Sequence, residues 1–87
     1  MLHVLVSGFV QGIGYRQFVK TKAMELNLTG WVRNLPASRV EAAFVGDEKK
    51  LKKMIEFLKK GPFLAEVDSI EVEEIRDQKF DNFEIIK

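Results

Sequence analysis

Apolar and polar residues follow two different periods along this chain, and these periods divide it into strands and helices. Short runs of apolar and β-branched residues predict five strands. The runs are 2–8, 28–35, 39–46, about 66–75 and the terminal stretch "FDNFEIIK". In the third run Val40, Ala42 and Phe44 alternate with Glu41 and Ala43, which is typical of a strand with two unlike faces.

Two other segments carry apolar residues at helical spacing. Between about 15 and 27, apolar residues recur with lysine and glutamate between them, which predicts an amphipathic helix. A second helix is expected to begin after Asp47, a favourable N-cap residue, and to stop at Gly61 and Pro62. Its apolar stripe consists of Leu51, Met54, Ile55 and Leu58.

The order of these elements is βαββαβ followed by a terminal strand. The turn "PAS" at 36–38 joins the second and third strands as a hairpin. This order predicts an α+β fold: a ferredoxin-like βαββαβ sandwich in which two helices cover one face of an antiparallel sheet. The short extra C-terminal strand is expected at the sheet edge. With 87 residues, the chain suits a single domain, 1–87, with one core.

Composition narrows the class of function. The chain has 14 basic and 13 acidic side chains, so it lacks the general positive field of a nucleic-acid binder. It has no cysteine, which excludes disulfides, thiolate metal sites and a cysteine nucleophile. No signal-peptide pattern is present, and no apolar run approaches the ~20 residues that cross a bilayer. We therefore expect a cytoplasmic protein with no nucleic-acid or membrane partner, and a monomer is the simplest expectation.

The stretch "SGFVQGIGYR", 7–16, is the most informative part of the sequence. It places Gly8, Gly12 and Gly14 between a predicted strand and a predicted helix, and it ends on Arg16. Backbone N–H groups are unpaired at a helix N-terminus, and glycines allow them to converge on an anion. The Arg16 guanidinium would hold the same anion. The stretch matches neither the P-loop nor the dinucleotide-binding pattern. On local chemistry alone, a tight turn with a surface arginine explains it equally well.

Asn34 stands out because asparagine is depleted in strands. At a strand end its amide either caps the backbone, which is the commoner case, or holds a water or a substrate oxygen. His3, the only histidine, is expected to be structural, and Trp31 is expected to pack on the sheet. The second helix has a face opposite its apolar stripe that is expected to be solvated. Its lysines are Lys49, Lys52, Lys53, Lys59 and Lys60.

Two longer segments resemble the signatures of the acylphosphatase family, and the resemblance extends over almost the whole chain. They are "VSGFVQGIGYRQFV" and "LTGWVRNLPASRVEAAFVG"; the signatures are close to G-R/K-V-Q-G-V-x-F/Y-R and G-F/W/Y-V-R/K-N-x-x-D-G. The resemblance implies a ferredoxin-like hydrolase that cleaves the anhydride between a carboxylate and phosphate without a metal or other cofactor. It also implies that Arg16 binds the phosphate and that Asn34 positions the attacking water. The loop amides implied to hold the phosphoryl oxygens are those of Phe9, Val10, Gln11, Gly12 and Ile13.

The sequence departs from these signatures at three places. Phe9 stands where a basic residue is usual, which removes a positive charge near the anion site. Ala37 and Ser38 replace the usual Asp-Gly, so the hairpin has to turn without glycine. Tyr15 replaces the commoner phenylalanine, and its hydroxyl needs a hydrogen-bond partner. The alternative to an enzyme is a non-catalytic module on the same scaffold that binds phosphate or carbamoyl phosphate.

Overall fold

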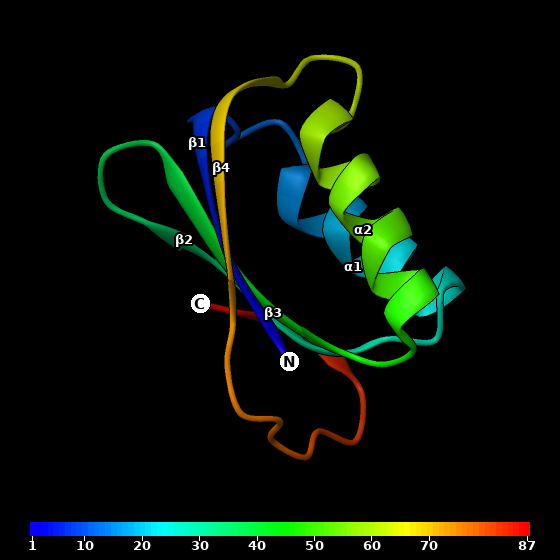
Figure 1. Ribbon diagram of the computed structural model, residues 1–87. Helices are drawn as coiled ribbons and strands as arrows, with labels where there is room; N and C mark the ends of the chain where they lie inside the picture. Colours follow the sequence, from blue (N-terminus) through cyan, green and yellow to red (C-terminus); the bar gives the residue numbers. More distant parts are fainter.

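The computed structural model describes residues 1–87 and contains five strands and two helices (Figure 1). In chain order these are β1 (Leu2–Phe9), α1 (Tyr15–Glu25), β2 (Thr29–Leu35), β3 (Arg39–Val45), α2 (Glu48–Lys60), β4 (Glu66–Glu74) and β5 (Phe83–Ile86). Every predicted element is present, and the βαββαβ order with a terminal strand is confirmed. Neither helix has the length and apolar character needed to span a membrane.

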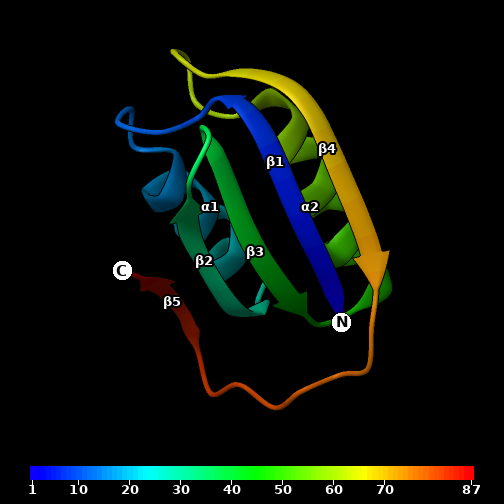
Figure 2. The same cartoon turned by 90° about the vertical axis from the view of Figure 1, so that its left-hand side faces the viewer.

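The strands form one sheet in the order β4-β1-β3-β2-β5. Both helices lie on the same face of this sheet (Figure 2). β1 to β4 pair antiparallel, as predicted for a ferredoxin-like sandwich, but β5 pairs parallel to β2 at the sheet edge, so the sheet is mixed. The segment between β4 and β5 stays at one end of the sheet (Figure 2). The chain therefore reverses direction and enters β5 in the direction of β2.

The hydrophobic core lies between the sheet and the two helices. Alternate residues of the central strands point into it, and Val4 and Val6 of β1 and Val40 and Phe44 of β3 have no exposed surface. The ring of Phe83 stacks on Phe44 with centroids 5.4 Å apart, which anchors the edge strand β5 to the core. The fully buried helix residues are Val19, Ala23, Met54 and Leu58.

Capping interactions set the ends of the helices. Asp47 caps α2 as predicted, because its side chain accepts a hydrogen bond from a backbone N–H of the first turn at 2.8 Å. α1 ends at Glu25 rather than near residue 27. Asn27 adopts a left-handed conformation with φ 56°, and the N–H of Leu28 donates to the carbonyl of Ala23 at 2.8 Å. This reversal closes the helix two residues earlier than the sequence predicts.

The face of the sheet away from the helices carries a cluster of polar and aromatic side chains. Glu41 accepts hydrogen bonds from Nε2 of His3 and Nε of Arg33, each at 2.6 Å. The Arg33 guanidinium also lies over the ring of Trp31, 5.5 Å from its centroid. These contacts fit the structural role predicted for His3 and the packing on the sheet predicted for Trp31. The acid partner of His3 is not evident from the sequence, since Glu41 becomes its neighbour only through the pairing of β1 with β3.

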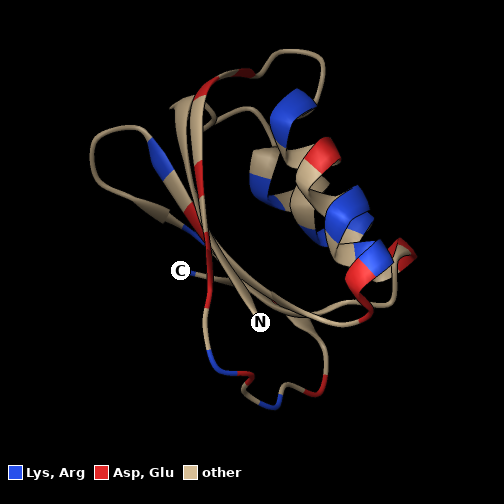
Figure 3. Ribbon diagram, in the orientation of Figure 1, with Lys and Arg blue, Asp and Glu red and all other residues tan.

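Surface charge differs between the elements (Figure 3). The edge strand β4 is acidic, whereas α2 carries its lysines on the side away from the sheet. The five α2 lysines expected on a solvated face are all exposed, opposite the buried Met54 and Leu58. The acidic residues of β4 are Glu66, Asp68, Glu71, Glu73 and Glu74.

Tyr15 links the two helices and gives a first testable prediction. Its buried hydroxyl donates to the carbonyl of Leu58 at 2.8 Å. This carbonyl has no partner in the helix, because Pro62 has no N–H. Burial raises the pKa of Tyr15, so the hydroxyl stays protonated and keeps donating. We predict that Tyr15→Phe lowers the free energy of unfolding by about 1–2 kcal/mol. Urea denaturation measures the difference, and equal midpoints would contradict it.

Glu41 gives a prediction about acid stability. Partial burial alone would raise the pKa of Glu41, but hydrogen bonds from His3 and Arg33 and the charge of Arg33 outweigh burial and hold this pKa below its usual value. A carboxylate with a lowered folded-state pKa stabilises the fold above its unfolded-state pKa, and this stabilisation is lost as the pH falls through the folded-state pKa.

We therefore predict that Glu41→Gln is less stable than the parent at pH 7, and that the difference narrows as the pH falls below about 4. Thermal unfolding of both proteins between pH 7 and pH 3 measures this difference. A difference that is independent of pH would show that the carboxylate charge contributes nothing.

Candidate active site

The loop between β1 and α1 contains two exposed glycines with a left-handed backbone. Gly12 has φ 74° and Gly14 has φ 79°. A Cβ atom at either position would meet nothing within 4 Å, so space is not limiting. Side chains rarely adopt this backbone conformation, whereas glycine adopts it readily. The path of the loop, and not crowding, therefore requires glycine here.

The backbone N–H groups of this loop are available to a ligand. Val10 donates to the carbonyl of Gly8 and Phe18 donates to the carbonyl of Gly14, but no N–H from 11 to 17 donates to a protein acceptor. No side chain caps α1, whose N-cap residue is Gly14. The free donors surround the positive end of the α1 dipole, and this arrangement favours an anion.

The free donors coincide only partly with the amides predicted to hold phosphate. The amides of 11–13 are free, but the N–H of Val10 is bonded to the carbonyl of Gly8 at 3.0 Å. Phe9 is still part of β1 and pairs with Glu66 of β4. After Val10, the run of free donors begins at Gln11 and continues into the first turn of α1.

A cavity of about 340 Å³ lies beside this loop. It brings together the loop, Arg16 from α1 and Asn34 from β2, as the sequence predicted for a common site. Of the predicted phosphate-binding segment, Phe9, Gln11 and Ile13 do not line the cavity. The lining residues are Val10, Gly12, Gly14, Tyr15, Arg16, Gln17, Asn34, Ile85 and Lys87.

Arg16 and Asn34 reach the cavity from different layers. Arg16 is the second residue of α1 and is half-buried. Asn34 follows the buried Val32 by two positions on β2, so it shares the sheet face that the helices cover. Neither side chain forms a hydrogen bond or an ion pair within the protein. The Asn34 amide thus does not cap the backbone, which was the commoner of its two interpretations.

Gln11 ties the loop to the β2–β3 hairpin. Its Nε2 donates to the carbonyl of Leu35 at 2.7 Å and to the carbonyl of Arg39 at 2.8 Å. Because Leu35 directly follows Asn34, this clamp fixes the position of the loop relative to the Asn34 amide. The sequence predicted only a backbone role for Gln11, since the carbonyls that it binds are brought close by the fold alone.

The hairpin turn keeps a left-handed backbone without glycine. Ala37 has φ 64° and Ser38 has φ 54°. This conformation costs roughly 1–2 kcal/mol for each L-residue. The departure from Asp-Gly therefore lowers the stability of the hairpin, whereas the Gln11 clamp still holds its strands in place.

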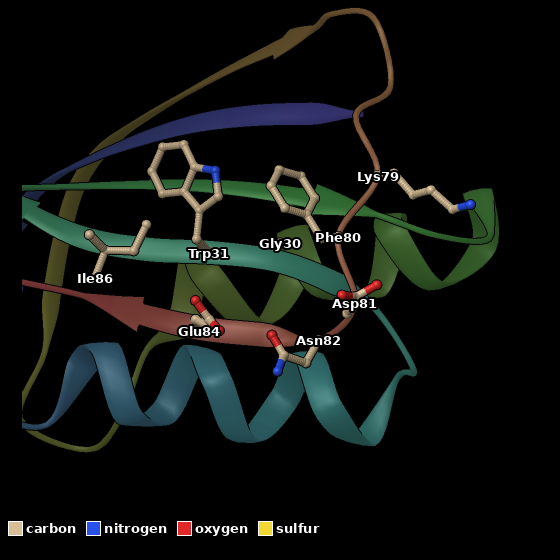
Figure 4. Close-up of a pocket in the computed structure, with 8 residues that line it drawn as sticks. All are labelled: Gly30, Trp31, Lys79, Phe80, Asp81, Asn82, Glu84 and Ile86. Atoms are coloured by element: carbon tan, nitrogen blue, oxygen red, sulfur yellow. The ribbon is translucent and has the colours of Figure 1, made fainter.

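A second cavity, of about 320 Å³, lies on the other face of β2 and β5 (Figure 4). The rings of Trp31 and Phe80 project over it on the side away from α1 (Figure 4). Its lining includes the carboxylates of Asp81 and Glu84 and a single cation, Lys79. Carboxylates repel phosphate. The cavity beside the glycine loop is therefore the candidate site for an anion.

Comparison with known proteins identifies the family. The model of the acylphosphatase family matches residues 2–85 of the chain. The chain belongs to the acylphosphatase family. An acylphosphatase from Acaryochloris marina is 46% identical over 86 residues, which cover 99% of this chain and 92% of that protein.

Solved structures agree with this assignment. The acylphosphatase from Bacillus subtilis is 37% identical, with a TM-score of 0.94 over 100% of both chains. HypF from T. kodakarensis is 44% identical with a TM-score of 0.81, over 97% of this chain and 11% of HypF. As a member of the acylphosphatase family, the protein is a hydrolase of acid anhydrides, and its substrates are acyl phosphates.

Two lining residues of this acylphosphatase cavity, Ile85 and Lys87, lie outside the site predicted from the sequence. The alternation in "FDNFEIIK" predicts a strand but not the strand with which it pairs, so no signal in the sequence places them here. Nowhere in the protein is a group of three or more His, Cys, Asp or Glu side chains arranged to hold a metal ion.

The Gln11 clamp gives a prediction about acylphosphatase activity. We predict that Gln11→Ala lowers kcat/KM about 10-fold. The loop loses its two hydrogen bonds to the hairpin, so its backbone N–H donors are no longer held in position relative to the Asn34 amide. Gln78→Ala, at an exposed site between β4 and β5, is the matched control. Initial rates of acyl phosphate hydrolysis measure the effect. Equal kcat/KM for the two variants would mean that the clamp does not position the loop.

Proposed function

We propose that this acylphosphatase binds the phosphoryl group of its substrate with Arg16 and the free backbone amides that begin at Gln11. The observation that carries the proposal is that Gly12 and Gly14, whose amides belong to this free run, line one cavity together with Arg16 and Asn34. Arg16 is free of ion pairs, so its guanidinium is available for a bidentate contact with two phosphoryl oxygens. The amides and the α1 dipole add partial positive charge.

Asn34 is proposed to position the attacking water. Its amide has no partner in the protein and shares the cavity with Arg16. The side-chain oxygen accepts a hydrogen bond from the water, which leaves a lone pair of the water directed at phosphorus. No Asp, Glu or His side chain lines this cavity. We therefore propose that a phosphoryl oxygen of the substrate accepts the proton of the water.

The chemistry of an acyl phosphate makes this short list of groups sufficient. The leaving group is a carboxylate, whose conjugate acid has a pKa of roughly 4. It departs without a general acid. Phosphoryl transfer then needs mainly alignment and stabilisation of charge on the phosphoryl oxygens, both of which this site supplies. The proposal includes no metal or other cofactor.

The proposal extends to the form in which the protein works. We propose that residues 1–87 act as a single domain, as a monomer and in the cytoplasm. The length of 87 residues suits one domain with a single core. Acyl phosphates are anions that do not cross membranes unaided, so a cytoplasmic hydrolase would meet those made in the same compartment.

A second candidate function is a non-catalytic module that binds phosphate or carbamoyl phosphate. The similarity to HypF favours it, because the matching region is only 11% of that longer chain. The two candidates differ in one measurable property. A module would bind inorganic phosphate without hydrolysing an acyl phosphate, whereas the enzyme would do both.

The proposed roles predict the effect of two substitutions. Arg16→Ala and Asn34→Ala are each expected to lower kcat/KM for benzoyl phosphate at least ~10²-fold, the scale of one transition-state donor. Rates are measured with EDTA present, and circular dichroism checks the fold. Arg76→Ala and Asn82→Ala, at exposed positions outside this cavity, are the matched controls.

Each outcome of this experiment is informative. Full activity of a folded Arg16→Ala or Asn34→Ala protein would refute the role of that residue. Phosphate binding by a folded parent that does not hydrolyse benzoyl phosphate would favour the non-catalytic module. Activity that disappears with EDTA and returns with a divalent cation would overturn the metal-free mechanism.

A further inference from the structure

The parallel pairing of β5 with β2 places a second cation beside Asn34. Val32 pairs with Ile85, and Arg33 pairs with Ile86. The next step in this register brings Lys87 next to Asn34. Lys87 directly follows β5, and continued alternation along the strand would give it the sheet face of Ile85 and the buried Phe83, which the helices cover. Lys87 accordingly lines the same cavity as Arg16 and Asn34.

Lys87 and Arg16 are the only residues with charged side chains that line this cavity. Lys87 forms no ion pair, so its charge is not compensated by a carboxylate side chain of the protein. Phe9 stands where the first signature usually has a basic residue, so the loop itself brings no cation besides Arg16. The two positive charges enter the cavity from different elements, Arg16 from α1 and Lys87 from the end of β5.

We propose that Lys87 is a second phosphate-binding cation of this acylphosphatase. Its ammonium contacts the phosphoryl oxygens on the side of the cavity where Asn34 lies, across from the loop amides. A phosphate monoester-like group carries about two negative charges near neutral pH. Two cations and the loop amides therefore match the charge of the substrate better than Arg16 alone. This inference rests on the proposed function of the cavity.

Lys87 is expected to act on binding more than on the chemical step. Inorganic phosphate, the bound acyl phosphate and the transition state all carry negative charge on the phosphoryl oxygens, so an ammonium attracts each of them. An interaction of equal strength in ground state and transition state lowers KM and leaves kcat unchanged. Because Lys87 is exposed, its contribution is also expected to weaken as salt screens the charge.

Three variants test this inference. Lys87→Met removes the charge and keeps the length of the side chain, Lys87→Arg restores a charge, and Lys79→Met removes a lysine that lines the other cavity. For each protein we would measure the Kd of inorganic phosphate by calorimetry, and kcat and KM for benzoyl phosphate, at low and high salt. Lys87→Met is expected to raise Kd and KM about 3- to 10-fold with kcat within about twofold, the effect of a partly exposed charge.

Lys87→Arg is expected to recover most of the affinity, and Lys79→Met to match the parent. The differences in Kd and KM between Lys87→Met and the parent should shrink at high salt.

Unchanged Kd and KM in Lys87→Met would overturn the inference. An equal change in Lys79→Met would also overturn it, because the net charge of the protein would then explain the effect. If the parent hydrolyses benzoyl phosphate but Lys87→Met behaves like it, only this inference fails. If the parent binds phosphate without turnover, the proposed catalytic function is refuted, and the Kd of inorganic phosphate alone tests the role of Lys87. A folded parent that neither binds phosphate nor hydrolyses benzoyl phosphate overturns both.

Discussion

The candidate site depends on a stretch of backbone whose N–H groups have no acceptor in the protein. Unpaired amides are tolerated only where water or a ligand reaches them, so the loop between β1 and α1 has to lie at the surface. The loop also has to hold one conformation, because a mobile loop would not keep its N–H groups directed at the same point. Val10 anchors one end in the core, and the Gln11 side chain fastens the loop to the hairpin. The left-handed glycines let the chain turn between these anchors and the helix.

The sheet gives this loop its counterpart. Asn34 lies on β2 and Lys87 directly follows the neighbouring strand β5, so the sheet contributes to the same cavity as the loop and α1. None of these side chains needs a buried charge to act. The arrangement fits a reaction whose leaving group is already stable, because alignment and positive charge are then the main requirements.

The sequence predicts most of the fold because periodicity and capping signals agree along the chain. Val4, Val40 and Phe44 identify the buried faces of central strands, and Asp47 marks a helix start. The orientation of β5 was not predictable, since the pattern of a strand does not depend on the direction of its neighbour. For the site, the signature residues Arg16 and Asn34 lie in one cavity.

The parts of the site that the sequence does not reveal depend on contacts between distant segments. The Gln11 clamp joins carbonyls that lie 24 and 28 residues further along the chain. Lys87 reaches the cavity only through the register of β5 on β2. The N–H of Val10 is withdrawn from the predicted set of donors by a bond to Gly8, two residues before it. Motif and spacing carry no information on any of these contacts.

The acidic strand β4 affects the tendency of the protein to aggregate with other copies of itself. β4 is an edge of the sheet, so part of its backbone is unpaired and open to strand addition from another chain. A second copy that paired there would bring two rows of carboxylates into contact, and their repulsion opposes such pairing. The other edge, β5, has only 4 residues and offers little backbone to extend. The fold therefore protects both edges against aggregation, one by charge and the other by its short length, although Val72 is exposed on β4.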